Sequence, residues 1–361
     1  MVAQWYEYMV NLYIMDYTKV LPLLEKAIEH NATDIHLVAD KPPVFRIHGE
    51  LSPSGLPPLK PEDIQNLIFS MMTESQRKTF LETQDMDLSY IGVKDFNFRV
   101  NAHVEKNRPA ANIRILPTLI PTAEELGLPA IVEKLARKRK GFIIITGSAG
   151  SGKTTTMNYM VDLINKARPF KIVMIEDPIE YVHVSQKSLI IQREVGTNTQ
   201  SFASALKHAL RQDPDVVVVG EIRDAESISM ALTTAETGHL VLTTLHAPDT
   251  VESINRILDT YPPGKQDQIR TQLAENLIGI IGQILIPLQG KEGRVLATEI
   301  LIPTLAIRNI IRRGALLEIR GQMVTGEEGM YTMEQCLTQL IKNGVITKDY
   351  AQEFTKFPNY L

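Results

Sequence analysis

Three consecutive segments of this chain decide its fold: Phe142-Ile-Ile-Ile-Thr146, Gly147-Ser-Ala-Gly-Ser-Gly-Lys-Thr154 and Thr155 to Lys166. The first is an apolar run typical of a strand, the second fits the phosphate-binding pattern G-x-x-x-x-G-K-[ST], and the third is compatible with a helix. In that order, backbone N–H groups of the loop and of the helix start point at one spot, which the helix dipole makes positive. The alternative is a Gly/Ser turn that matches by chance, but both flanking elements are present. The sequence therefore predicts a nucleoside triphosphate site.

The glycine loop supplies most of the residues that we expect to contact the nucleotide. Glycines allow the backbone to approach phosphate oxygens closely, Lys153 reaches the β and γ phosphates, and the Thr154 hydroxyl can hold Mg²⁺. ATP and Mg²⁺ are therefore the expected cofactors. The expected nucleotide-binding residues are Gly147, Ser148, Ala149, Gly150, Ser151, Gly152, Lys153, Thr154 and Thr155.

The length and charge of the chain exclude several other classes of protein. A chain of 361 residues, 44% of them hydrophobic, suggests about two domains with ordinary cores. A net charge of −4 provides no global attraction to nucleic acid or anionic lipid, which leaves only local basic patches. The single cysteine, Cys336, excludes a disulfide framework and a cysteine-ligated structural zinc site, and it suits a reducing cytoplasm. The N-terminus lacks a basic region and a cleavage site, and Leu277 to Leu288 is too short to span a bilayer, so we expect neither export nor membrane insertion.

The first third of the chain has the pattern of an α+β domain. Hydrophobic periodicity predicts helices over Thr18 to His30, Glu62 to Met72 and Glu74 to Thr83. Alternating residues predict strands over 34–38, 44–48, 86–91, 97–104 and 111–116. Pro117 and Pro121 interrupt any element that crosses them, so we expect a linker over 117–125 and a domain boundary near residue 120.

After the boundary, strands and helices alternate. Short apolar runs without polar alternation predict strands that are covered on both faces of a parallel sheet: 142–146, 171–175, 216–219 and 240–244. Helical stretches lie between several of them, including Phe202–Arg211 and Ala225–Thr237, and the tail from Ala306 onward is expected to form several helices. The fold class is therefore α/β, with a doubly wound nucleotide-binding core.

Carboxylates follow two of the predicted strands. Val216-Val-Val-Val219 runs through Gly220 to Glu221, where a phosphate-loop ATPase places an acid that binds Mg²⁺ or activates water. The usual preceding Asp is replaced by Gly220, so Glu221 is the expected general base; the alternative is an acid at the start of the following helix. Glu176, Asp177 and Glu180 follow another strand and either hold Mg²⁺ through water or form a solvated acidic turn.

Histidines flank the predicted strand over residues 240–244. His246 follows it and is a candidate for reporting the γ-phosphate state to a neighbouring element, although a lone histidine more often has a structural role.

The order and spacing of these segments resemble the type II/IV secretion ATPase superfamily, and within it the retraction ATPases of type IV pili, which drive twitching motility. The resemblance covers residues from about 18 to the C-terminus. Its motifs are the phosphate loop, the acidic box 175–180, the modified Walker B segment 213–224, the histidine box 234–246 and the N-terminal segments 34–37 and 42–51. Ala306-Ile-Arg-Asn-Ile-Ile-Arg312 resembles the helix that distinguishes retraction motors from assembly motors.

The resemblance implies an N-terminal PAS-like α+β domain over 18–116, a linker over 117–125, and a RecA-like ATPase domain with C-terminal helices over 126–361. It leaves 1–17 as an extension without an assigned role. It also implies a cytoplasmic homo-hexamer at the inner-membrane face of the pilus machine, peripheral to the membrane through partners and acting on an inner-membrane platform protein, with no nucleic-acid partner. Arg99, Arg108 and Arg114 are the candidates for an arginine that acts on a neighbouring subunit's nucleotide.

Several alternatives remain open at this point. An assembly or secretion ATPase of the same superfamily usually carries a four-cysteine zinc element, and this chain has one cysteine. An accessory retraction ATPase, a nucleic-acid motor and a nucleotide-dependent switch with little turnover are further candidates. Arg308 and Arg312 are expected to form an i, i+4 basic pair on the face opposite the core, either as solvated arginines or as a surface that transmits force.

Overall fold

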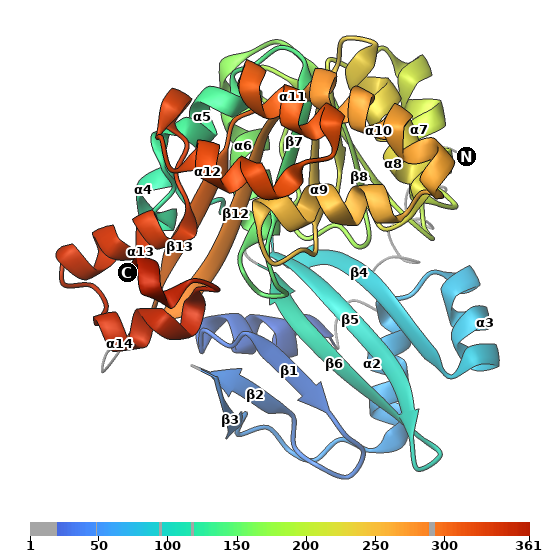
Figure 1. The fold of residues 1–361 in the computed structure, drawn as a ribbon. Coiled ribbons are helices and arrows are strands. Elements are labelled where there is room, and N and C mark those ends of the chain that lie inside the picture. The colour runs from blue at the N-terminus through green and yellow to red at the C-terminus, as the bar shows by residue number, and fades with distance from the viewer. Residues whose placement is uncertain (1–19, 48, 94–95, 117–118, 289–292) are drawn as a thin grey trace. The chain divides into compact units, whose positions relative to one another are not determined.

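The computed structural model describes residues 20–47, 49–93, 96–116, 119–288 and 293–361 (Figure 1). The extension over 1–17 lies outside the described residues. The described residues form two compact units: those up to Leu119 together with Pro178–Val182 make up the first, and those of Ile120–Asp177 and His183–Leu361 make up the second. This division differs from the expected one in two ways. The segment expected to be a linker, 117–125, contains a short helix, α4 (Ala123–Leu126), which Thr122 caps. The sequence also contained no signal that Pro178–Val182 would belong to the first unit.

The first unit is built on a six-stranded antiparallel sheet with the strand order β3-β2-β1-β6-β5-β4. Along β5, Phe98, Val100 and Ala102 are buried and alternate with polar residues, which is the pattern of a sheet with one covered face. They pack with a helix over residues 20–29, with α2 (Pro61–Ser70) and with α3 (Glu74–Thr83). The strands are β1 (Asp34–Leu37), β2 (Val44–Ile47), β3 (Glu50–Pro53), β4 (Asp85–Val93), β5 (Phe96–Glu105) and β6 (Arg108–Leu116).

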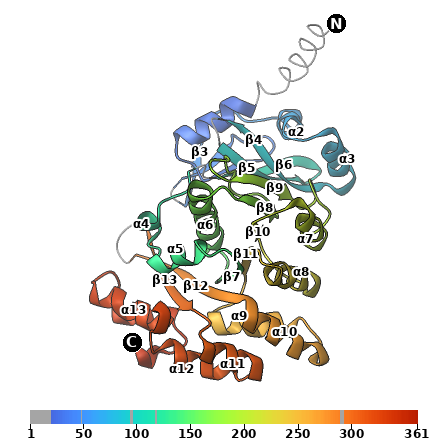
Figure 2. The same ribbon diagram turned by 90° about the horizontal axis from the view of Figure 1, so that it is seen from above.

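The second unit is built on a seven-stranded sheet with the order β13-β12-β7-β11-β10-β8-β9, which can be followed in Figure 2. In this spatial order, the strands from β12 through β7, β11, β10 and β8 to β9 run parallel to one another. The edge strand β13 runs antiparallel to its neighbour β12. The predicted core strands are confirmed, whereas β9, β12 and β13 extend the sheet beyond the prediction. The strands are β7 (Gly141–Thr146), β8 (Lys171–Glu176), β9 (Leu189–Glu194), β10 (Val216–Val219), β11 (Leu240–Leu245), β12 (Leu277–Pro287) and β13 (Arg294–Leu301).

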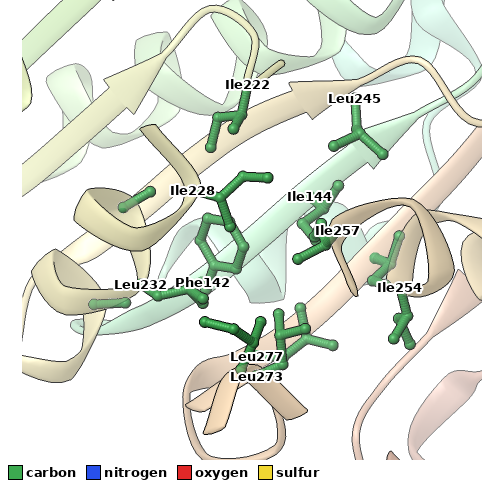
Figure 3. Packing of buried hydrophobic residues seen from close by; sticks show 14 of the residues in the cluster. Phe142, Ile144, Ile222, Ile228, Leu232, Leu245, Ile254, Ile257, Leu273 and Leu277 are labelled. Carbon is green, nitrogen blue, oxygen red and sulfur yellow. The ribbon is translucent and has the colours of Figure 1, made fainter. Parts of the chain in front are cut away.

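Helices cover both faces of this sheet, as the continuously apolar strands require. Phe142 and Ile144 of β7 point to one face, where they pack against apolar residues of α8, α9 and α10 (Figure 3). Ile143 and Ile145 point to the other face, against α5 and α6. The helices are α5 (Ala130–Ala136), α6 (Lys153–Ala167), α7 (Phe202–Ala209), α8 (Ala225–Glu236), α9 (Thr250–Asp259) and α10 (Pro263–Asn276).

The C-terminal region is helical, as predicted. It contains α11 (Leu305–Arg313), α12 (Ile319–Met323), α13 (Met333–Lys342) and α14 (Lys348–Ala351). Ile307, Ile310 and Ile311 of α11 are buried in the core cluster that contains α10, so this helix packs on the core through one apolar face. None of the helices within the described ranges is both long and apolar enough to cross a membrane.

Candidate nucleotide-binding and catalytic site

The glycine loop joins the carboxyl end of β7 to the first turn of α6, in the predicted order of strand, loop and helix. Gly150 and Gly152 have φ values of 76° and 87°, in the left-handed region that favours glycine. At Gly147, an added Cβ would lie 2.4 Å from the backbone oxygen of Gln283 and 2.5 Å from Ser151 Oγ. The loop therefore needs glycine at all three positions for its backbone conformation, and at Gly147, where φ is 151°, also for space.

Lys153, the first residue of α6, is buried beneath the loop. Its ammonium donates hydrogen bonds to the carbonyl oxygens of Gly147, at 3.0 Å, and Ser148, at 2.8 Å. These bonds hold a positive charge beside the loop backbone and the α6 N-terminus. The ammonium, the backbone N–H groups of the loop and the α6 N-terminus all favour an anion at this place, as predicted for a triphosphate.

The carboxyl ends of β7, β11, β10 and β8 lie along one edge of the sheet because these strands are parallel. This edge brings together segments that are far apart in the sequence. The Thr146 hydroxyl at the end of β7 donates to the backbone oxygen of Ala247, at 3.0 Å, and accepts a hydrogen bond from the Ala247 N–H. His246, just before Ala247, is thereby held at the edge that carries the glycine loop.

Glu221 lies at the same edge, two residues beyond β10. One carboxylate oxygen is 2.5 Å from an Arg223 nitrogen, and the other is 3.5 Å from His246 Nε2. Burial lowers the pKa of His246, and the nearby Lys153 ammonium lowers this pKa further, whereas Glu221 raises it. The imidazole is therefore mainly neutral at pH 7. Arg223 was not identified from the sequence, where it reads as one more charged residue after a strand.

The packing around Gly220 explains the missing acid before Glu221. Gly220 donates its N–H to the Ile175 carbonyl of β8 and accepts a hydrogen bond from the Thr244 hydroxyl of β11. A Cβ at this position would lie 3.3 Å from the Cα of Glu176. A side chain is thus hard to fit between the strands, and the glycine fixes the place from which Glu221 extends.

The residues of the acidic box occupy different environments. Glu176 is buried at the end of β8, where it accepts a hydrogen bond of 3.0 Å from Gln192, whereas Asp177 is exposed. Glu180 belongs to the segment that groups with the first unit. Within the described residues, no group of three or more His, Cys, Asp or Glu side chains has a geometry that could hold a metal ion.

The three candidate arginines belong to the first unit. Arg99 on β5 and Arg114 on β6 are directly opposite each other in the sheet, and Arg114 forms an ion pair of 2.8 Å with Asp34. Arg108, at the start of β6, forms an ion pair with Asp40. At about 3.4 Å per residue, the six residue steps along β6 from Arg108 to Arg114 separate these two side chains by roughly 20 Å. Arg108 and Arg114 therefore cannot contact the same phosphate group.

Arg308 does not have the solvated role that the sequence suggested. Its guanidinium donates to the carbonyl oxygens of Ala274, Glu275 and Leu277, two of these bonds being 3.0 Å long. It therefore caps the C-terminal end of α10, which lies beside α11 in Figure 1. Burial lowers the pKa of Arg308. Arg312, in contrast, is exposed, and its guanidinium lies 3.9 Å from Glu275.

A strand–glycine-loop–helix unit in a parallel sheet, with an acid two residues beyond a neighbouring strand, defines the class of P-loop nucleotide hydrolases. Residues 17–333 match the family described as "Type II/IV secretion system protein". The chain belongs to this family and is an ATPase, as the resemblance implied.

Individual relatives agree with this assignment. The chain is 41% identical to the "Type IV pilus retractation ATPase PilT" of Pseudomonas aeruginosa, over 95% of this chain and 99% of that protein. It is also 41% identical to a "Twitching motility protein" of Neisseria gonorrhoeae, over 92% and 89% of the two chains. A crystal structure described as the "Pilus Retraction Motor PilT and Bound ADP" superposes with a TM-score of 0.89 at 45% identity, covering 95% of this chain and 98% of that chain. The predicted resemblance and fold are confirmed.

Proposed function

We propose that this ATPase is a hexameric motor that hydrolyses ATP to power the retraction of type IV pili. The observation that carries the proposal is the near full-length similarity to proteins named for pilus retraction and twitching motility. The α11 segment adds support, since Ala306–Arg312 resembles the motif of retraction motors rather than of assembly motors.

The chemistry that we propose for the site uses residues of the second unit. The loop N–H groups and Lys153 bind the triphosphate. The Thr154 hydroxyl, which has no hydrogen-bond partner among the described residues, is available to Mg²⁺, and Glu176 is the acid of the box best placed to orient one of its waters. When bound, Mg²⁺ would neutralise charge on the phosphate oxygens. Glu221 accepts the proton of the attacking water, and His246 orients its carboxylate.

A ring would complete this site. Phosphoryl transfer is accelerated by positive charge near the transferred group, often from an arginine of a neighbouring subunit. Arg99 and Arg114 are the better candidates, because they are directly opposite each other in the sheet and can therefore act on the same phosphate group; Asp34, which pairs with Arg114, offsets part of the repulsion between them. We assign Arg108, at the other end of β6, a structural ion pair with Asp40. Rotation of the two units against each other would couple hydrolysis to movement.

The proposed place of action is the cytoplasmic face of the inner membrane, where the ring would act on the platform protein of the pilus machine. ATP and Mg²⁺ are its proposed cofactors, and no nucleic-acid partner is proposed, since the net charge is −4. ATPase stimulation by DNA or RNA would contradict this part of the proposal.

A deletion strain tests the function directly. We expect loss of twitching motility together with excess surface pili, restored by the wild-type gene but not by Glu221→Gln, which removes the base and keeps the side-chain shape. Loss of surface pili would instead identify an assembly motor. Full rescue by Glu221→Gln would show that the protein acts without ATP turnover, as a switch.

A further inference from the structure

Gln283 lies behind the phosphate loop, in the middle of β12. It is the only polar side chain among Leu277-Ile-Gly-Ile-Ile-Gly-Gln-Ile-Leu-Ile286 and is only 1% exposed. Pairing between β12 and β7 reaches Gly282 and Thr146, so Gln283 is level with the point where β7 enters the loop. A buried polar side chain in an apolar strand is unfavourable without a hydrogen bond, which makes its contact informative.

Gln283 contacts both ends of the loop. An added Cβ on Gly147 would lie 2.4 Å from its backbone oxygen, and an added Cβ on Gly152 would lie 3.2 Å from its side-chain nitrogen Nε2. That nitrogen donates a hydrogen bond of 2.7 Å to the backbone oxygen of Ser151. The opposite orientation of the amide would set two oxygens against each other, so the donor must face the loop.

The bond to Ser151 fixes one peptide group of the loop. The carbonyl of Ser151 and the N–H of Gly152 belong to the same planar, trans peptide unit and therefore point in opposite directions. With the carbonyl held toward Gln283 of β12, the Gly152 N–H points the opposite way, away from β12. Gly152 is the N-cap of α6 and has a left-handed backbone without a side-chain cap, so no side chain of its own restrains this peptide.

We propose that Gln283 is a positioning residue for the phosphate loop: by holding the Ser151–Gly152 peptide, it keeps one N–H aimed at the nucleotide phosphates without touching the nucleotide. Its own amide oxygen is buried and has no hydrogen-bond partner among the described residues. The Oε1 acceptor of Gln283 thus stays unsatisfied, which is unfavourable, while its Nε2 donor forms the hydrogen bond to the loop. A side chain present only to fill the core would be apolar here, as its neighbours in β12 are.

The first test replaces Gln283 with methionine, which has a similar shape and no donor. Phosphates are bound in both the ground state and the transition state, so we expect KM for ATP and Kd for ADP to rise about tenfold, as for one lost hydrogen bond, and kcat to stay within about threefold. The matched control is Thr298→Val: Thr298 is opposite Gln283 on β13, is buried, and bonds Tyr331 rather than the loop. This control should keep KM and Kd within about twofold of the wild-type values.

A second variant keeps the proposal testable if methionine disturbs folding. In Gln283→Glu, the ionised carboxylate repels the Ser151 carbonyl, whereas the protonated acid can donate to it. ADP affinity of this variant should improve on going from pH 8 to pH 6 relative to the wild type. The proposal is overturned if Gln283→Met leaves KM and Kd unchanged, if Thr298→Val raises them equally, or if Gln283→Glu shows no such pH dependence.

The inference rests on the loop being the phosphate site. Lys153→Ala, measured in the same assay, separates the two claims: if it bound ADP as tightly as the wild type, the site assignment itself would be wrong. Weak binding by Lys153→Ala with normal binding by Gln283→Met would overturn only the role of Gln283.

Discussion

Arg308→Ala is expected to destabilise the second unit, because the guanidinium caps the last turn of α10. The substitution removes hydrogen bonds to the carbonyl oxygens of Ala274, Glu275 and Leu277. Bonds from a charged donor contribute about 1.5–3 kcal/mol each when buried, but Arg308 is partly exposed and water will replace part of the loss. We therefore expect a total loss of about 2 kcal/mol, which corresponds to about 4–8 °C in melting temperature for a unit of this size.

Arg312→Ala is the matched control for this substitution. It lies one turn further along α11, is exposed, and is 3.9 Å from its only carboxylate partner among the described residues, Glu275. Exposed pairs of this kind contribute about 0.5 kcal/mol, so the melting temperature of this variant should stay within about 2 °C of the wild-type value.

Circular dichroism melts of the wild type and both variants decide between the two roles of Arg308. Equal melting temperatures for all three proteins would refute the capping role. If Arg308→Ala then also abolished twitching, the helix would transmit force, as the sequence motif alone suggested. If Arg312→Ala melted normally and abolished twitching, force transmission would be assigned to Arg312.

Two further predictions concern buried charge and the ring. Burial raises the pKa of Glu299 to about 7, against the opposing effect of the Thr250 N–H that it accepts at 2.6 Å. Because the folded pKa lies above the unfolded value of about 4.5, the contribution of Glu299 to stability is present below pH 4.5 and is lost as the pH rises through 7. The free energy of unfolding of Glu299→Gln should therefore exceed that of the wild type by about 3 kcal/mol at pH 8 and by almost nothing at pH 4.5. Urea unfolding that gives the same difference at both pH values would contradict this. Arg114→Ala should bind ATP but lose hydrolysis, Arg108→Ala should keep most of its activity, and rings mixed from Arg114→Ala and Lys153→Ala subunits should regain part of it. No recovery after verified subunit exchange would exclude a shared site.

Local sequence was sufficient to predict the parts of the site that depend on one strand and its next few residues. The loop after β7, the acid after β10 and the histidine after β11 each follow an apolar run, and parallel strands bring their carboxyl ends to one edge. For the same reason the sequence predicted the core strands and the helices around them. The α4 helix in the expected linker shows the limit of composition, because Thr122 caps a helix immediately after the two prolines.

Long-range contacts could not be predicted in this way. From the sequence alone, Arg308 has the pattern of a surface arginine. Its role as a cap depends on the neighbouring helix α10, and the sequence contains no signal that α10 lies beside α11. Gln283 is separated from Ser151 by 132 residues, and the sequence hint was only a single glutamine in an apolar run. Likewise, Glu176 and Asp177 are adjacent in sequence, but one is buried and the other exposed, because Glu176 still belongs to β8.

The most direct test of the catalytic account measures ATP hydrolysis and ATP binding by purified Glu221→Gln. The amide keeps the size of the side chain but cannot accept the proton of the attacking water, so turnover at saturating ATP should fall at least about 100-fold while the Kd for ATP stays within about threefold of the wild-type value. Retention of most of the wild-type turnover would contradict the account and would move the role of general base to Glu176 or another acid at the carboxyl edge of the sheet.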